Sequence, residues 1–106
     1  MDKPLATSPI KRLNRLLTSE NLWLYLLSLI KRGGTLYAYG LDRQIESEFL
    51  FKPSKVMIYI VLYRLENEGL IRSEFQQRRK YYSLTEKGEE ALGQAREHFR
   101  MLAQKL

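Results

Sequence analysis

The chain has 106 residues and no cysteine, with 44% hydrophobic and 28% charged residues. This length favours one folded domain, and the composition excludes a disordered chain, a disulfide scaffold and a thiolate metal site. Lysine and arginine outnumber aspartate and glutamate by 18 to 12, and the resulting net charge of +6 indicates a polyanionic partner.

The positive charge is unevenly distributed along the chain. Residues 1–34 carry six cations and two acids, and residues 70–85 carry four cations and one acid. The remaining segments are nearly balanced. The excess therefore points to an N-terminal arm and a later hairpin as the places where a polyanion would bind.

The N-terminal part predicts a basic arm and two helices. Ser8 is a candidate N-cap with Pro9 at the first helical position, which predicts a helix over residues 9–17. A second helix is expected over residues 20–31. Its apolar run, residues 22–30, is far shorter than the roughly 20 residues that span a bilayer. The first residues show no secretory cleavage pattern, so we expect a cytoplasmic protein that does not bind membranes.

The second helix is apolar nearly all round, so it needs cover on several sides. We expect a partner subunit to supply part of this cover, with Leu22 and Leu26 in the subunit interface. Trp23 and Tyr25 lie on the same helix and are interpreted as core residues. The alternative for these two is a pocket at the subunit seam for a small aromatic effector.

The middle of the chain predicts a short strand and two helices. Residues 35–40 suit a very short strand, and Leu41, Ile45 and Phe49 recur at the spacing of an amphipathic helix. Pro53 ends that helix, because the residue before a proline avoids the helical region. The next helix runs through "PSKVMIYIVLYRLENEG". Its inner face is expected to hold Ile58, Val61, Leu62 and Leu65, and its outer face Lys55, Tyr59 and Tyr63.

The last third predicts a hairpin and a final helix. Strands over residues 70–75 and 80–84 flank a polar tip, and Thr85 is a candidate N-cap for the helix that follows. That helix carries a heptad seam, which predicts an interface with a second subunit. The seam consists of Leu92, Ala95, Phe99, Leu102 and Leu106.

This order of elements predicts a mainly α fold with a small β-wing, the winged helix-turn-helix. We expect three parts: a basic N-terminal arm and helix at 1–19, the winged helix-turn-helix domain at 20–85, and a C-terminal dimerisation helix at 86–106. Both terminal helices would pair subunits.

In such a fold the second of the paired helices enters the DNA major groove. Lys52, Ser54 and Lys55 cluster at its start, where backbone N–H groups and the helix dipole favour phosphate. Tyr59 can contact a thymine methyl or donate to a phosphate, and Tyr63 follows one turn later. The alternative interpretation of both tyrosines is core or interface packing.

Three consecutive cations, Arg78, Arg79 and Lys80, are expected at the tip of the wing. There they can reach flanking phosphates or a neighbouring minor groove, whose narrow form attracts arginine. The alternative is a solvated turn kept soluble by charge.

Catalytic motifs are missing from the sequence. It shows no nucleophile with a base, no paired carboxylates and no phosphate loop, and His98 is the single histidine. We therefore expect neither an enzyme nor a metal or cofactor site.

The stretches "LYAYGLDRQI", "KVMIYIVLYRLENEGLI" and "RRKYYSLTEKGEEAL" occur in this order. Together they resemble the PadR family of transcriptional regulators, particularly its archaeal branch, over about residues 20–95. The matching positions are Tyr39, Gly40, Ile58, Tyr59, Leu62, Leu65, Glu66, Gly69, Leu70, Ile71, Tyr81, Tyr82, Leu84, Thr85 and Gly88. The resemblance implies a homodimeric repressor that binds an operator near a promoter, with its C-terminal helix against the partner's N-terminal helix. It also implies DNA contact by Tyr59 and by the basic wing before Tyr81.

The main hypothesis is therefore a sequence-specific, dimeric regulator of transcription that binds double-stranded DNA. Two alternatives remain open. One is an architectural protein that coats DNA without sequence preference, and the other is a winged helix that uses the Tyr59 and Tyr63 face as a protein–protein adaptor.

Overall fold

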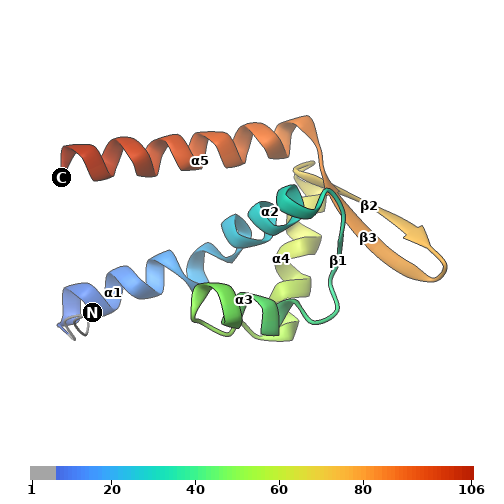
Figure 1. Ribbon diagram of the computed structural model, residues 1–106, viewed down its shortest axis with the longest axis horizontal. Coiled ribbons are helices and arrows are strands. Elements are labelled where there is room, and N and C mark those ends of the chain that lie inside the picture. The colour runs from blue at the N-terminus through green and yellow to red at the C-terminus, as the bar shows by residue number, and fades with distance from the viewer. Residues whose placement is uncertain (1–6) are drawn as a thin grey trace.

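The helices and strands follow in the predicted order (Figure 1). The structure is a computed structural model and describes residues 7–106. Its elements are α1 (Ser8–Leu17), the 3₁₀ turn η1 (Ser19–Asn21), α2 (Leu22–Gly33), β1 (Leu36–Tyr37), α3 (Leu41–Phe49), α4 (Lys55–Asn67), β2 (Ile71–Gln76), β3 (Arg79–Leu84) and α5 (Glu86–Lys105). The winged helix-turn-helix prediction is confirmed: α3 and α4 are the paired helices, and β2 and β3 form the wing.

The start of α1 differs from the prediction by one residue. Thr7 has the extended backbone of an N-cap, and Ser8 is already helical. Pro9 still lies in the first turn, where its missing N–H leaves no hydrogen bond unmade. The first six residues of the predicted basic arm lie outside the described residues.

The core surrounds α2, whose buried side chains are Leu22, Leu26, Leu27, Leu29 and Ile30. The elements α4, α5 and β3 pack against this helix. The chain itself therefore supplies most of the cover that we had expected from a partner subunit. Each fully buried aliphatic side chain contributes roughly 1.5–3 kcal/mol, so α2 is the main source of hydrophobic stabilisation.

This packing corrects three residues of the predicted subunit interface. Leu22, Leu26 and Leu92 are 2%, 0% and 4% exposed within a single chain. They are core residues and have almost no surface left for a second subunit. The helical spacing predicted burial correctly but could not tell which molecule provides it.

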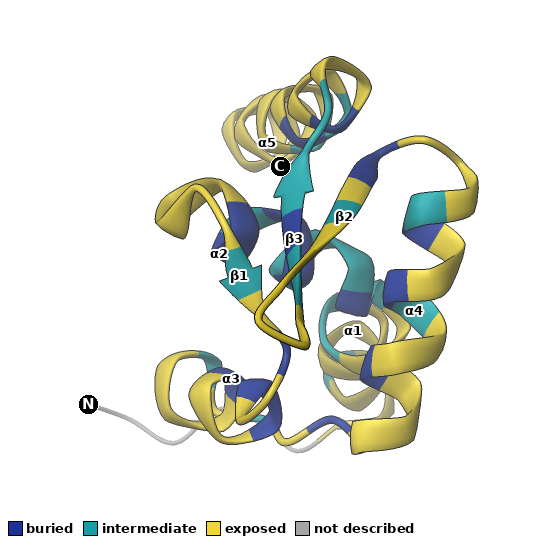
Figure 2. Cartoon of the chain, turned by 90° about the vertical axis from the view of Figure 1, so that its right-hand side faces the viewer, coloured by how far each residue is buried: buried dark blue, intermediate teal, exposed yellow. Residues whose placement is uncertain are grey.

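The sheet is antiparallel with strand order β1-β3-β2, and Figure 2 shows the hairpin with its buried base and exposed tip. Tyr37 of β1 pairs with Tyr81, and Glu74 of β2 pairs with the same residue from the other side. The tip residues Gln77 and Arg78 have φ of 51° and 69°. Two positive φ angles at the centre of a two-residue hairpin match the twist of the flanking strands.

The first turn of α5 is docked closely on the core. Thr85 caps the helix as predicted, because its Oγ1 accepts a hydrogen bond from Gly88 N at 3.1 Å. A Cβ on Gly88 would lie only 2.0 Å from the carbonyl oxygen of Leu70. Glycine is therefore the residue that lets α5 approach the start of β2.

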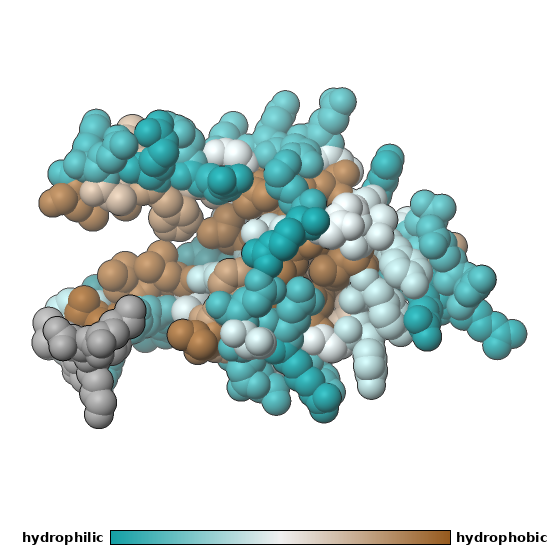
Figure 3. All heavy atoms as spheres, viewed as in Figure 1, coloured by the Kyte–Doolittle hydropathy of each residue, from teal (hydrophilic) through white to brown (hydrophobic). Residues whose placement is uncertain are grey.

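Beyond this turn, α5 leaves the core and runs alongside α1, with a gap between the two helices (Figure 1). α1 has no buried residue, and α5 has only Gly88 and Leu92. Figure 3 shows apolar side chains on the facing sides of these two helices. Within residues 7–106, no helix is both long and apolar enough to cross a membrane.

Candidate nucleic-acid interface

The helix α4 presents a continuous exposed face of apolar and aromatic residues. Ile58, Leu62 and Leu65 are buried as predicted, whereas Val61, the fourth residue of the predicted inner face, is only partly buried. The outward residues are Val56, Tyr59, Ile60 and Tyr63, which are 67%, 52%, 37% and 66% exposed. Their spacing of i, i+3, i+4 and i+7 forms one stripe, so the core interpretation of the two tyrosines is wrong. Thymine methyl groups in a major groove are a suitable partner for such a surface.

The start of α4 combines a capped helix end with cations. Ser54 is the N-cap, and its Oγ accepts a hydrogen bond from Met57 N at 3.2 Å. Lys52 and Lys55 stand on either side of it and are both exposed. The Ser54 hydroxyl keeps its own proton free for donation, so this end offers hydroxyl, ammonium and backbone N–H groups to an anion.

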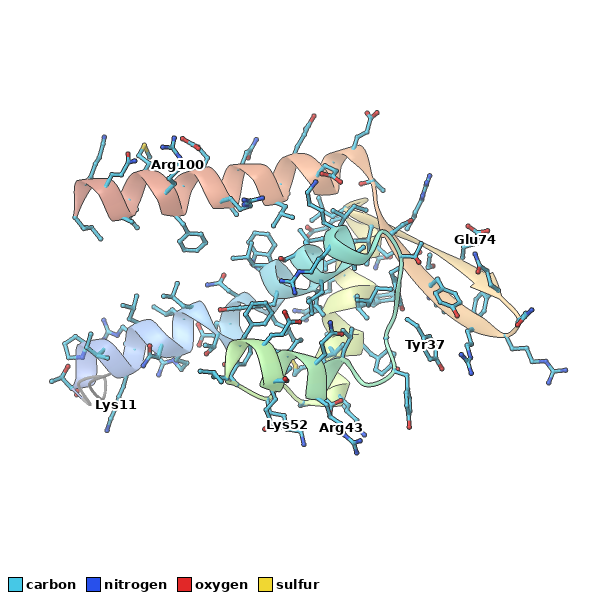
Figure 4. All side chains as sticks on the ribbon, in the orientation of Figure 1. Lys11, Tyr37, Arg43, Lys52, Glu74 and Arg100 are labelled. Carbon is cyan, nitrogen blue, oxygen red and sulfur yellow. The ribbon has the colours of Figure 1, made fainter. Side chains whose placement is uncertain are left out.

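Arg43 belongs to the same surface and is an addition to the residues predicted from the sequence. It is exposed on α3, two positions before the buried Ile45. Figure 4 shows the side chains of Arg43 and Lys52 pointing to the same side of the molecule, away from α5. Its outward position could have been predicted from helical spacing. Arg43 lies in the first turn of α3 between Leu41 and Ile45, and it faces outward because these two apolar residues face the core.

A small cavity joins the starts of the paired helices. Its volume is about 170 Å³. Tyr39, Asp42 and Arg43 line it on one side, and Lys55 and Tyr59 line it on the other. Asp42 is 3% exposed and is the single buried charged residue among residues 7–106. The cavity shows that Tyr39 and Tyr59, which are 20 positions apart in the chain, border the same surface.

Arg79 and Lys80 of the wing point to opposite faces of the hairpin. Arg78 occupies the tip, and Arg79 begins β3 with its guanidinium carbon 5.2 Å from the centre of the Tyr37 ring. Lys80 Nζ lies 3.7 Å from Glu66 of α4. Alternate residues of a strand point to opposite faces of the sheet, so the expected placement of all three at the tip is wrong for Lys80.

Lys80 faces Tyr82 as well as Glu66. Its Nζ lies 5.5 Å from the centre of the Tyr82 ring, in the range of a cation–π contact. Burial raises the pKa of the Tyr82 phenol, and the nearby ammonium of Lys80 opposes part of this effect.

Five of the cations in the described chain are held in ion pairs. Lysines and arginines pair with carboxylates in Arg15–Glu20, Lys31–Glu89, Arg32–Glu48, Lys80–Glu66 and Arg100–Glu97. Twelve cations of residues 7–106 have no carboxylate within ion-pair distance, and five of these twelve lie at the starts of the paired helices and at the end of the wing. They are Arg43, Lys52, Lys55, Arg78 and Arg79. Cations without a carboxylate partner are free to bind the phosphates of a nucleic-acid backbone.

The structure does not bring Trp23 and Tyr25 to one pocket. Trp23 lines an open groove of about 700 Å³ with Met57, Val61 and other residues of α4. Tyr25 packs edge-on against Phe49 and Phe51, with ring centres 4.8 and 4.9 Å apart, and its hydroxyl donates to the carbonyl of Leu17. Burial raises the pKa of its phenol. The contacts of Tyr25 agree with its interpretation as a packing residue of the core, and they do not support the alternative of an effector pocket shared with Trp23.

The described residues also contain no group of three or more side chains that could hold a metal ion.

Comparisons with known proteins place this geometry in context. No curated protein matches the sequence significantly. A PadR-like transcriptional regulator from Bacillus cereus is 28% identical, with a TM-score of 0.71 over 87% of this chain and 91% of that chain. A winged-helix DNA-binding protein from STIV is 25% identical, with a TM-score of 0.67 over 78% and 90%. A PadR family regulator from Eggerthella lenta shares the fold, with a TM-score of 0.75 over 91% and 87% at 23% identity.

The family itself follows from a match along the sequence. The model of the transcriptional regulator PadR-like family matches residues 26–94, from the middle of α2 into α5. This is well over half of the chain and includes both paired helices and the wing. PadR family regulators are DNA-binding proteins and not enzymes. This chain therefore belongs to the PadR-like family of transcriptional regulators.

Proposed function

We propose that the protein is a sequence-specific, dimeric regulator that represses transcription by occupying an operator at a promoter. One observation carries this proposal: the exposed cations Arg43 and Lys55 line the same cavity as Tyr59, so positive charge lies directly beside the exposed stripe of α4. A protein that only coated DNA would need the charge alone. The exposed aromatic and β-branched stripe adds a surface suited to base edges.

The contacts divide into two kinds. Lys52, Ser54 and Lys55 hold phosphates at the start of α4, while Tyr59 and Tyr63 face bases in the major groove. Arg78 and Arg79 reach the adjacent minor groove from the wing. Lys80 instead supports the wing from within.

A second subunit is the proposed partner of the terminal helices. Phe99, Leu102 and Leu106 are 40%, 42% and 95% exposed on the free part of α5. Leu13 and Leu16 on α1 are 49% and 39% exposed. Pairing these apolar surfaces would remove them from water and join two copies of the chain. Ala95 lies on the same seam and is partly buried.

The dimer sets the geometry of the operator. Two copies of α4 should lie about 34 Å apart, one turn of B-DNA, and read a roughly palindromic site. A dimer bound over a promoter blocks access of the transcription machinery, which is the simplest repressor mechanism. This activity belongs in the cytoplasm.

Selection of bound fragments from a random duplex library tests the function. We expect a palindromic consensus and an affinity at least about 10³-fold above that for random duplex. A duplex-binding protein without consensus would instead be an architectural coat, and absence of duplex binding at low salt would favour the adaptor. Placing the consensus over a promoter in purified transcription then tests repression, since a repressor must lower transcript yield only on that template.

A further inference from the structure

Two tyrosines connect the recognition helix α4 to the wing. Tyr39 borders the cavity that Lys55 and Tyr59 also line. Its ring stacks on that of Tyr37, with ring centres 6.2 Å apart and 24° between the planes. Arg79 of the wing then lies over Tyr37. We call Tyr37 and Tyr39 the tyrosine bridge, because these two rings lie between the cavity beside α4 and Arg79 of β3.

The local structure explains why the bridge stands where it does. Tyr37 pairs in register with Tyr81, and their ring centres are 5.7 Å apart. Side chains paired across neighbouring strands lie on the same face of the sheet, so Tyr37 follows the face that carries Arg79. Gly40 has φ of 82° and turns the chain into α3 directly after Tyr39. Figure 4 shows Tyr37 between the hairpin and the loop that leads to α3.

The bridge is open to a partner. Tyr39 is 80% exposed and Tyr37 is 40% exposed. Within residues 7–106, neither phenol hydroxyl makes a hydrogen bond to another protein group. The bridge is itself uncharged but stands between unpaired cations, with Arg43 and Lys55 at one end and Arg79 at the other. This combination of neutral donors and flanking positive charge complements a sugar–phosphate strand.

The geometry of B-DNA indicates which part of the sugar–phosphate backbone the bridge would contact. A single sugar–phosphate backbone separates each major groove from the neighbouring minor groove. A protein with α4 in the major groove and its wing in the adjacent minor groove must cross that backbone between the two elements. The tyrosine bridge lies between these two elements, since Tyr39 borders the cavity beside α4 and Tyr37 lies under Arg79 of the wing.

We propose that the tyrosine bridge binds the DNA sugar–phosphate backbone that lies between the major groove and the adjacent minor groove. This inference rests on the proposed function. The Tyr39 hydroxyl donates a hydrogen bond to one phosphate, and its ring lies against the deoxyribose. Tyr37 acts as a positioning residue, because its ring holds the Arg79 guanidinium toward the minor groove. The bridge thus couples the recognition helix to the wing.

Tyr39→Phe and a chemical change in the DNA test the phosphate contact together. The probe is a labelled duplex of about 30 base pairs carrying the selected consensus, long enough for two half-sites. We expect Tyr39→Phe to bind roughly tenfold more weakly, as for loss of one hydrogen bond to a charged group, with an unchanged salt dependence because no cation is lost. Single methylphosphonates, which neutralise one phosphate each, should weaken wild type at the bridged position. At that position a methylphosphonate should not weaken binding by the Tyr39→Phe variant any further. If the methylphosphonate and Tyr39→Phe instead lower the affinity independently and additively, the proposed contact is wrong.

A double-mutant cycle tests Tyr37. Tyr37→Phe keeps the aromatic face and should bind like wild type, whereas Tyr37→Leu should weaken binding and flatten the salt dependence as Arg79→Ala does. The combination of Tyr37→Leu with Arg79→Ala should bind no more weakly than Arg79→Ala alone. Equal effects of Tyr37→Phe and Tyr37→Leu, or full additivity with Arg79→Ala, contradict the positioning role.

Controls distinguish failure of the tyrosine-bridge proposal from failure of the proposed function. Arg96→Ala removes one exposed cation from α5 and should leave binding unchanged, and thermal unfolding checks that each variant is folded. If wild type binds the consensus and Tyr59→Ala weakens it while all bridge variants bind normally, only the bridge is wrong. If wild type does not prefer any duplex, the proposed function and the bridge both fail.

Discussion

Lys80 Nζ lies 3.7 Å from the Glu66 carboxylate, and this contact turns one of three consecutive wing cations toward α4. Glu66 also accepts a hydrogen bond from the hydroxyl of Ser73 at 2.5 Å. Both contacts join the inner face of the wing to the last turns of α4. The wing therefore divides its charge between support by Lys80 and an outward surface formed by Arg78 and Arg79.

The first prediction concerns this division. Replacing both Arg78 and Arg79 by alanine should weaken binding to all duplexes and reduce the slope of log affinity against log salt by about 0.9 for each lost phosphate contact. Lys80→Ala is the matched control and should change the slope little, because its ammonium already has a carboxylate partner. Fluorescence anisotropy between about 50 and 200 mM salt measures both. Equal slopes for the double variant and wild type would remove the wing from the contact surface.

The second prediction concerns base recognition by α4. Tyr59→Ala should lower affinity for the consensus by about 1–3 kcal/mol and lower affinity for random duplex much less. Tyr59→Phe keeps the ring and separates apolar contact from hydrogen bonding. Competition between labelled consensus and unlabelled random duplex gives the specificity ratio. If Tyr59→Ala weakens both duplexes by the same factor, the outward stripe of α4 does not read bases.

The third prediction uses two glycines of α5 as a matched pair. Gly88→Ala should destabilise the fold by roughly 1–3 kcal/mol, because the new Cβ would lie 2.0 Å from the Leu70 carbonyl oxygen and α5 must shift. A Cβ on Gly93 meets nothing within 4 Å, so Gly93→Ala should stabilise by about 0.5–1 kcal/mol through helix propensity. Urea unfolding at one fixed protein concentration measures both. Opposite signs are required, and a stable Gly88→Ala variant would refute the close docking of α5.

The fourth prediction concerns the terminal helices. Phe99→Asp should weaken self-association by about 100-fold or more, because it places a charge in the apolar seam. Gln94→Asp adds the same charge at an exposed position of α5 outside the seam and is the matched control. Sedimentation equilibrium at micromolar concentration should find wild type and Gln94→Asp as dimers and Phe99→Asp as a monomer. A well-folded wild-type monomer under these conditions would rule out the proposed pairing.

Local signals in the sequence were sufficient for the elements and their order. Thr85 marks the start of α5 because a cap acts within three residues of itself. The buried face of α4 follows from helical spacing, and Pro53 marks the break before it. The outward position of Tyr59 follows from the same spacing once the opposite face is assigned to the core.

Only the tertiary structure decided how these pieces use their side chains. Leu22 and Leu92 carried the apolar pattern of an interface, but burial depends on which helices pack against them, and here the chain covers both. Lys80 differs from Arg79 because the pleat of β3 sends the two side chains to opposite faces. The row from Tyr39 to Arg79 joins residues 40 positions apart, and such a juxtaposition arises only when β1 pairs with β3. Short-range periodicity in the sequence determines which face of a helix or strand is apolar. Long-range packing determines which residues that face contacts and which groups the neighbouring charged side chains contact.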